Sequence, residues 1–187
     1  MAGDDVGQLS WWDTASGKRL AATLSHRRRV TGGAFSPDGA RAASVGEDGT
    51  VALWDTASLQ TNAFFKGHIN AAFGVAFAPD TCRLATGGGG RDAVKLWDLF
   101  THRELVVLPG QGFLFSFVAF SPDGNWLAAC NSQGQLHLWH APSWAEIEAA
   151  EKREAADVAL TRETGESGRR HESRMNEGNV PAGTTGP

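Results

Sequence analysis

The chain has 187 residues, of which 41% are hydrophobic and 23 are glycines, a composition typical of a turn-rich β domain. Its net charge of −4 argues against binding to nucleic acid or to an anionic membrane surface, because no global positive field surrounds the protein. Two cysteines, Cys82 and Cys130, are too few for a disulfide framework and favour a reducing compartment. No apolar run follows the acidic N-terminus, so we expect a cytoplasmic protein without a signal peptide or membrane span.

Short β-strands separated by turns are predicted along most of the chain, after a frayed start at residues 1–5. Asp48-Gly49 is a strong hairpin signal between two of these strands. Residues 67–108 repeat the same alternation of strands and turns. The strands before and after that segment are predicted at residues 9–12, 19–24, 30–35, 40–45, 50–54, 59–65, 115–120, 126–130 and 135–139.

The strand ending at Trp54-Asp55 recurs along the chain at nearly constant steps. The tryptophans that end such strands are Trp12, Trp54, Trp97 and Trp139, in steps of 42, 43 and 42 residues. A second landmark, Phe-Ser-Pro-Asp-Gly or a close variant, keeps the same step at residues 35–39, 77–80 and 120–124. A period of about 40–45 residues with a Trp-Asp strand ending is typical of a propeller blade of four strands.

On these motifs, residues 5–140 resemble the WD40-repeat family. The resemblance implies an all-β fold, a partial and open β-propeller of about 3.5 four-stranded blades. The repeats are expected within a domain spanning residues 1–142, at about residues 5–25, 26–67, 68–110 and 111–140.

The fourth strand of the last repeat is replaced by a different kind of sequence. Pro142 interrupts the chain, and Ser143 and Glu146 form a capping box that predicts a short α-helix over residues 143–160. Residues 161–187 have almost nothing to bury and are expected to be a disordered tail.

The family resemblance also implies a polar network that pins each blade, made of a His, a Ser or Thr, an Asp and the strand-ending Trp. The first full repeat matches with His26, Ser44, Asp48 and Trp54. We expect Asp48 to accept from the imidazole, while the other ring nitrogen reaches the Ser44 hydroxyl and that hydroxyl takes the indole donor.

The second and third repeats keep less of this pattern. The second matches with His68, Thr86, Asp92 and Trp97, although a longer turn puts Arg91 at the usual Asp position. The third has lost the network, since the corresponding residues are Gln111, Ala129, Gln133 and Trp139.

Catalytic and ligand-binding alternatives find weaker support. A Ser-His-Asp hydrolase site is disfavoured because the same set recurs in successive repeats, whereas an active site is needed once. Gly87–Gly90 is not followed by Lys-Ser or Lys-Thr or by a helix, as a phosphate loop requires. His102, His137, His140 and His171 lack the spacing of metal ligands, so no metal or other cofactor is assigned.

The densest basic cluster is Arg27, Arg28 and Arg29, in the loop after the first predicted strands. Two interpretations remain open for it. The cluster is either solvated loop charge or a contact for an acidic partner surface or a phosphate.

The function expected is that of a non-catalytic scaffold for protein–protein interaction. Residues 138–144 resemble the end of large bacterial WD40-repeat proteins, some of which carry a serine/threonine kinase domain. A regulatory module of such a kinase and an enzyme that uses the propeller channel are the alternatives, although kinase motifs are absent. Trp11, Phe115 and Phe117 would cap the terminal repeats poorly, so we expect self-association or an upstream propeller segment to cover them.

Overall fold

The computed structural model describes residues 1–90 and 92–141 of the chain. The contacts between residues divide the chain into two units, Met1–Ala141 and Pro142–Pro187. The helix predicted at residues 143–160 and the tail predicted at residues 161–187 therefore lie outside the described residues.

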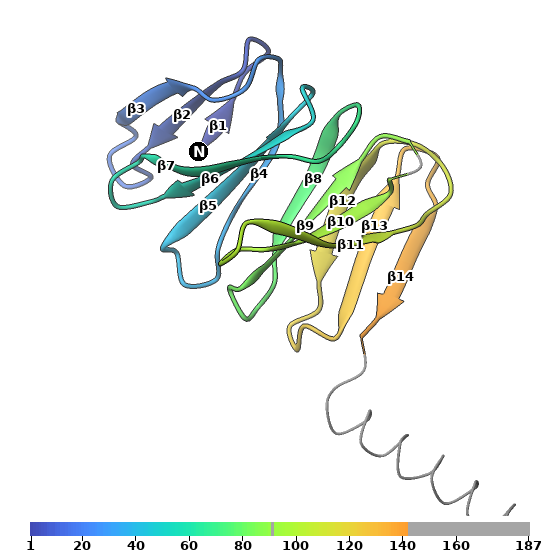
Figure 1. Cartoon of the computed structure of the whole chain (residues 1–187). Helices are drawn as coiled ribbons and strands as arrows, with labels where there is room; N and C mark the ends of the chain where they lie inside the picture. The colour runs from blue at the N-terminus through green and yellow to red at the C-terminus, as the bar shows by residue number, and fades with distance from the viewer. Residues whose placement is uncertain (91, 142–187) are drawn as a thin grey trace, which may run out of the picture. The chain divides into compact units, whose positions relative to one another are not determined.

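All regular structure in the described part is β-strand, as predicted (Figure 1). The strands are β1 (Ala2–Gly3), β2 (Gln8–Trp12), β3 (Arg19–Leu24), β4 (Val30–Phe35), β5 (Arg41–Gly46), β6 (Thr50–Asp55), β7 (Thr61–Lys66), β8 (Ala72–Phe77), β9 (Arg83–Gly88), β10 (Val94–Asp98), β11 (Arg103–Leu108), β12 (Phe115–Phe120), β13 (Trp126–Asn131) and β14 (Leu136–His140). None of these residues forms a helix of the length and apolarity that a membrane span requires.

The strands form four antiparallel sheets, which we call sheets 1 to 4. Sheet 1 contains β1-β2-β3, sheet 2 contains β4-β5-β6-β7, sheet 3 contains β8-β9-β10-β11 and sheet 4 contains β12-β13-β14. Each sheet keeps its strands in chain order, and the first strands of sheets 2, 3 and 4 lie next to one another (Figure 1). This succession of meandering sheets is an open, partial propeller, since the described sheets close no ring.

The N-terminal residues are more ordered than the sequence indicates. Residues 1–5 were expected to be frayed, with the first repeat beginning near residue 5, but Ala2 and Gly3 pair with Ser10 and Leu9 to form β1. The Asp4 carbonyl also accepts a hydrogen bond of 3.0 Å from the Val30 amide. The Asp4–Val30 hydrogen bond ties the N-terminus to sheet 2, and residues 1–5 by themselves encode neither this bond nor the pairing of β1 with β2.

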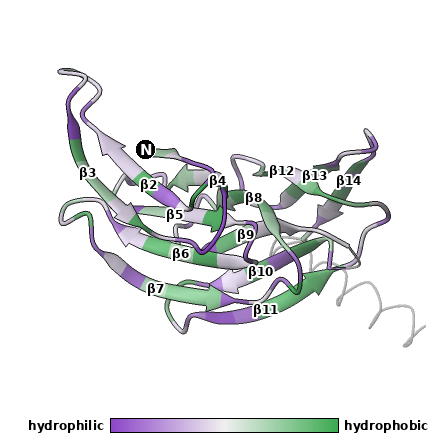
Figure 2. Ribbon diagram, turned by 90° about the horizontal axis from the view of Figure 1, so that it is seen from above, coloured by the Kyte–Doolittle hydropathy of each residue, from purple (hydrophilic) through white to green (hydrophobic). Residues whose placement is uncertain are grey.

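Apolar side chains between successive sheets form the core. Figure 2 shows hydrophobic stretches along strands such as β6 and β11. Trp11 packs edge-on against Trp54, with ring centroids 5.7 Å apart, between sheets 1 and 2. Phe65 stacks on Trp97 at 5.5 Å between sheets 2 and 3, and Phe115 is buried between sheets 3 and 4. The expectation that Trp11 and Phe115 are poorly covered was therefore wrong, because the neighbouring sheet covers each of them.

Glycines allow the first strand of one sheet to approach the sheet before it. A Cβ at Gly32 would lie 2.5 Å from the Phe73 carbonyl oxygen, and one at Gly74 would lie 3.1 Å from the Phe115 carbonyl oxygen. The equivalent of these glycines in sheet 4 is Phe117. Each of the three residues forms the second pair between the first and second strands of its sheet: Gly32 with Val45, Gly74 with Gly87, and Phe117 with Cys130. At this position sheet 4 carries a large exposed ring in place of a glycine.

Candidate functional site

The first polar network joins four residues of sheet 2 to His26, which lies in the loop before it. The Trp54 indole Nε1 donates to the Ser44 hydroxyl at 3.1 Å, and the Ser44 hydroxyl lies 2.8 Å from His26 Nε2. On the other side of the ring, His26 Nδ1 lies 2.7 Å from the Thr50 hydroxyl, which donates to Asp48 Oδ1 at 2.6 Å. The structure thus brings together the four residues named from the sequence.

Thr50 occupies the place that the sequence analysis assigned to a direct imidazole–carboxylate bond. His26 Nδ1 is 3.4 Å from Asp48 Oδ1, farther than from the threonine oxygen. Because the Thr50 proton goes to the carboxylate, the threonine oxygen accepts from Nδ1–H, and Nε2 then accepts from Ser44. The sequence signal was available: Thr50 lies two residues after Asp48 and four before Trp54.

Burial keeps this imidazole neutral. Desolvation lowers the pKa of His26, and the charge of Asp48 opposes that shift only in part. Burial by itself raises the pKa of Asp48, but hydrogen bonds from the Thr50 hydroxyl and the Arg27 amide outweigh it, so that the pKa lies below its ordinary value. A neutral ring and an ionised carboxylate are the states that the direction of the hydrogen bonds requires.

The second network is incomplete. Trp97 Nε1 donates to the Thr86 hydroxyl at 2.8 Å, and that hydroxyl lies 2.7 Å from His68 Nε2. Ala93 stands four residues before Trp97, where sheet 2 has Thr50, so this repeat has no second hydroxyl. The Asp92 carboxylate lies 3.7 Å from Lys95 Nζ, and His68 Nδ1 has no hydrogen-bond partner within the described residues.

The stability of the sheet domain should fall in acid because of His68. Burial, and then the nearby Lys95 cation, lowers the pKa of His68 to about 4 from an ordinary value of 6.5. Below pH 6.5 the His68 imidazole is protonated in the unfolded chain but stays neutral in the folded protein, so the free energy of unfolding declines until the folded pKa is reached. The loss over this range should be about 3 kcal/mol, measured by urea unfolding at several pH values.

The matched variant for this measurement is His68→Gln, whose side-chain amide can still reach Thr86 and does not titrate. Its free energy of unfolding should depend less steeply on pH between 6.5 and 4, with a residual slope from His26. Equal slopes for the two proteins would contradict the assignment. Aspartates whose pKa values are lowered in the folded protein change its stability only below about pH 4, so they do not contribute to the slope measured between pH 6.5 and 4.

Sheet 4 replaces the network with an amide cluster around Asn131, a buried residue that the sequence analysis missed. Asn131 Nδ2 donates to the Gln111 carbonyl at 2.7 Å and to Gln135 Oε1 at 2.8 Å. Its Oδ1 accepts from the backbone amides of Gln133 and Gln135, each at 3.0 Å. Of the residues named from the sequence, Ala129 is buried in the core and Trp139 packs against that core.

A register comparison explains why Asn131 appears here. Its equivalents are Gly46 and Gly88, which pair with the first residues of β4 and β8 as Asn131 pairs with the first residue of β12. A Cβ at Gly46 would lie 2.8 Å from the His26 ring, and one at Gly88 would collide with the His68 ring. The histidine ring and the asparagine side chain thus fill the same space in different repeats.

The geometry of the first network does not suit hydrolysis. Ser44 is fully buried, and the His26 ring beside it is nearly so. The hydroxyl already bonds both the indole and the imidazole, whereas a nucleophile must meet a substrate. Among the described residues, no group of three His, Cys, Asp or Glu side chains is placed to hold a metal ion.

The remaining histidines and the glycine run have packing roles where they are described. His102 lies against Phe65 and His140 against Trp126, with ring centroids 5.6 and 4.4 Å apart. His137 lies against Phe115 at 5.2 Å, whereas His171 lies outside the described residues. Gly87 and Gly88 end β9, and the two glycines after them begin the turn to β10.

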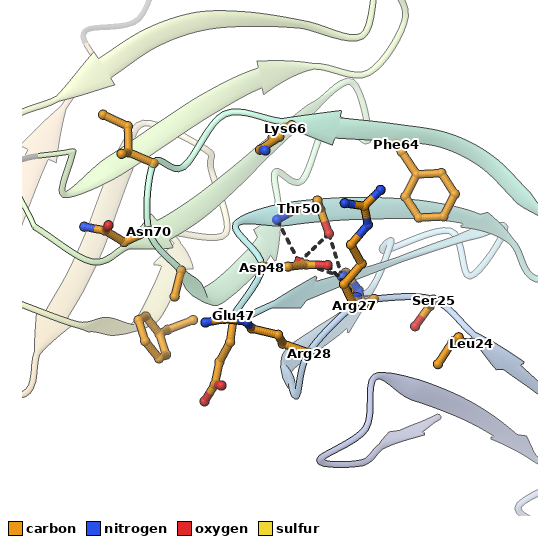
Figure 3. Close-up of a pocket in the computed structure, with 14 residues that line it drawn as sticks. Leu24, Ser25, Arg27, Arg28, Glu47, Asp48, Thr50, Phe64, Lys66 and Asn70 are labelled. Atoms are coloured by element: carbon orange, nitrogen blue, oxygen red, sulfur yellow. Dashed lines mark hydrogen bonds and ion pairs between the residues drawn. The ribbon is translucent and has the colours of Figure 1, made fainter.

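One concave feature is a groove of about 910 Å³, which we call the loop-face groove (Figure 3). Arg27 and Arg28 line it, together with Glu47, Lys66 and the exposed side chain of Phe64. The loop that carries the two arginines is fixed by sheet 2, since the Arg27 amide donates to Asp48 Oδ2 at 2.7 Å. Three members of the first polar network, His26, Asp48 and Thr50, therefore belong to the lining of a basic and partly apolar groove.

The three neighbouring arginines do not act alike. Arg29 Nε lies 3.3 Å from Asp5 Oδ1, and Arg29 does not line the groove. The side chains of Arg27, Arg28 and Lys66 have no carboxylate within ion-pair distance in residues 1–90 and 92–141. Two of the three predicted contact residues therefore remain available to a ligand of the groove.

Successive antiparallel sheets define the chain as a blade-repeat protein, and in the two four-stranded sheets, 2 and 3, a buried hydroxyl holds the tryptophan near the end of the third strand. The family model described as "WD domain, G-beta repeat" matches residues 17–55, 59–98 and 103–140. The chain belongs to the WD40-repeat family, because these matches cover more than half of it. A Drosophila melanogaster relative, described as "Protein LST8 homolog", is 36% identical over 56 residues. The match covers 30% of this chain and 18% of that relative, so the chain spans only a small part of its length.

Proposed function

We propose that the chain is a non-catalytic scaffold that binds a segment of another protein in the loop-face groove. Membership of the WD40-repeat family supports a role in protein–protein interaction in general. The observation that carries the specific proposal is the pair of guanidinium groups of Arg27 and Arg28, which line an open groove and have no carboxylate partner among residues 1–90 and 92–141. The alternative, solvated loop charge, predicts that removing the two arginines leaves the binding of an acidic ligand unchanged.

The chemistry of the lining defines the ligand as an acidic segment with apolar side chains. Arg27, Arg28 and Lys66 outnumber the two carboxylates of the lining, Glu47 and Asp48. The Asp48 carboxylate is already occupied by Thr50 and by the Arg27 amide, so Glu47 is the anion that remains. Phe64 and Ile69 are 58% and 86% exposed, and Ile69 also lines the groove, which gives an apolar segment something to cover.

The test uses a short fluorescein-labelled peptide that alternates glutamate with leucine, and the same design with lysine as its control. Substituting both Arg27 and Arg28 with alanine should weaken binding of the acidic peptide roughly 3–10-fold, the loss expected for two exposed ion pairs. The salt dependence of binding should fall with it. The folded sheets should keep their stability, since neither side chain is packed in the core.

The matched control is alanine substitution of Lys18 and Arg103, two exposed cations away from the groove. This double variant has the same net charge as the groove variant and should bind the acidic peptide like the wild type. Equal affinities of all three proteins for the acidic peptide would show that Arg27 and Arg28 are solvated surface charge and do not bind a ligand.

We also propose a cytoplasmic location. Both cysteines are free in the structure, which supports a reducing compartment. Cell fractionation that placed the protein in an oxidising compartment would overturn this part of the proposal.

A further inference from the structure

Sheet 4 presents an apolar face that belongs to a series of covered faces. Along β14, Leu136 and Leu138 are 62% and 57% exposed, and Phe117 on β12 is 53% exposed. The register places Leu136 opposite Cys130, which pairs with Phe117, so these side chains share one face of the sheet. We call this face the trailing face.

The equivalent residues of sheet 2 show what such a face is built for. Val51 and Leu53, three residues and one residue before Trp54, correspond to Leu136 and Leu138 before Trp139. Both are buried in the core between sheets 2 and 3. The trailing face therefore repeats a surface that another sheet covers everywhere else in the series.

Phe117 decides what kind of sheet can cover the trailing face. In sheets 2 and 3 the same position is a glycine, because the first strand of the next sheet approaches to within contact of a Cβ there. A next sheet with such a strand would meet the Phe117 ring instead of a glycine. The face thus fits a sheet that lacks a strand at that place.

Sheet 1 has the complementary form. In the described structure the inner edge of sheet 1 is β1. This strand is equivalent to the second strand of the other sheets, because Ala2 pairs with Ser10, two residues before Trp12. In sheet 2 the second-strand residue Ser44 likewise pairs with Ala52, two residues before Trp54. No described strand lies where β8 and β12 cross the glycines of sheets 2 and 3. The outward face of sheet 1, which we call the leading face, also carries exposed apolar side chains at Trp12, Leu20 and Leu24.

We infer that the trailing face binds the leading face of a second copy of this chain, head to tail. Leu136 and Leu138 would lie against Trp12, as Val51 and Leu53 lie against the Trp97 side of sheet 3. Phe117 would enter the space beside β1, where the described residues place no inner strand. Contacts of this heterologous kind close into a ring when the rotation permits, and two copies would supply eight sheets, within the typical range of about 4–8 blades.

The experiment measures the mass of the full chain by sedimentation over a range of concentrations. Wild type should associate, and Trp12→Glu and Leu138→Glu should each raise the dissociation constant roughly 10–100-fold, as expected for buried anchors. Both side chains are half exposed in one copy, so circular dichroism should show an unchanged fold. Phe100→Glu is the control, because Phe100 is 92% exposed and lies on neither face.

A mixture of the two variants distinguishes head-to-tail contact from other pairings. The Leu138→Glu copy keeps an intact leading face and the Trp12→Glu copy an intact trailing face, so the mixture should regain one wild-type interface and associate. If two trailing faces paired with each other instead, Trp12→Glu would associate like the wild type, and mixing it with Leu138→Glu would not restore association of the Leu138→Glu copy. A monomeric wild type at every concentration, or a dimer that ignores Trp12→Glu, overturns the inference.

Discussion

Replacing Thr86 with valine should lower the free energy of unfolding by roughly 2–5 kcal/mol, because two buried polar atoms lose their partner at once. Valine keeps the shape of threonine and removes only the hydroxyl. The Trp97 indole donor and His68 Nε2 both bond that hydroxyl, and Thr86 is fully buried. Since His68 Nδ1 already has no partner in the described part, the ring has no bond to exchange for the lost one.

The control is Thr86→Ser, which keeps the hydroxyl and removes a methyl group. Serine already serves at this position in sheet 2, where Ser44 bonds Trp54 and His26. The serine variant should lose only about 0.5–1.5 kcal/mol, the cost of a small cavity. Urea unfolding followed by tryptophan fluorescence gives both values, and a valine variant no weaker than the serine variant would mean that the hydroxyl contributes only by its volume.

The second large effect is expected at Gly87, where the inner strand of sheet 4 crosses sheet 3. A Cβ at Gly87 would fall against the Phe115 carbonyl oxygen, well inside van der Waals contact. The atom it meets is backbone and cannot rotate away, so Gly87→Ala must displace β12 or break the pairing of β8 with β9. We expect a loss of about 1–3 kcal/mol or more, the range for overpacked interiors.

Gly89→Ala, two residues further along, separates this clash from any general cost of replacing glycine. The nearest heavy atom to a Cβ at Gly89 is 3.5 Å away, an ordinary contact. This control should stay within about 0.5 kcal/mol of the wild type in thermal or urea unfolding. If both alanine variants lost the same stability, the close approach at Phe115 would not be what requires Gly87.

The repeated sheets could be predicted from the sequence because each repeat encodes its turns and strand ends locally. The steps between Trp12, Trp54, Trp97 and Trp139 fix the repeat, and the order of strands within a meander follows from chain order. The contacts that the sequence analysis missed are those that depend on residues outside the local segment. β1 forms only because residues near position 10 pair with it, and nothing in residues 1–5 signals this.

The candidate site was predictable in its members and less so in their connections. A position-by-position match finds His26, Ser44 and Trp54, but it does not show which atom lies between the imidazole and Asp48. The Thr50 hydroxyl oxygen lies closer to His26 Nδ1 than the Asp48 carboxylate does, by less than an ångström. The spacing of residues in the sequence cannot predict so small a difference in distance. For the same reason, adjacent positions in the sequence gave no sign that Arg29 turns to Asp5 while Arg27 lines the groove.

The exchange of a histidine ring for an asparagine side chain at the end of the second strand restricts how such repeats can diverge. A lineage that goes from Gly46 with His26 to Asn131 with Gln111 must alter two sites that are twenty residues apart in sequence. If asparagine replaced Gly46 first, its side chain would collide with the His26 ring. If His26 were replaced first, a void would remain beside Gly46. Neither intermediate is well packed, so the two positions should be inherited as a pair, and a library that randomises one of them alone would recover few folded proteins.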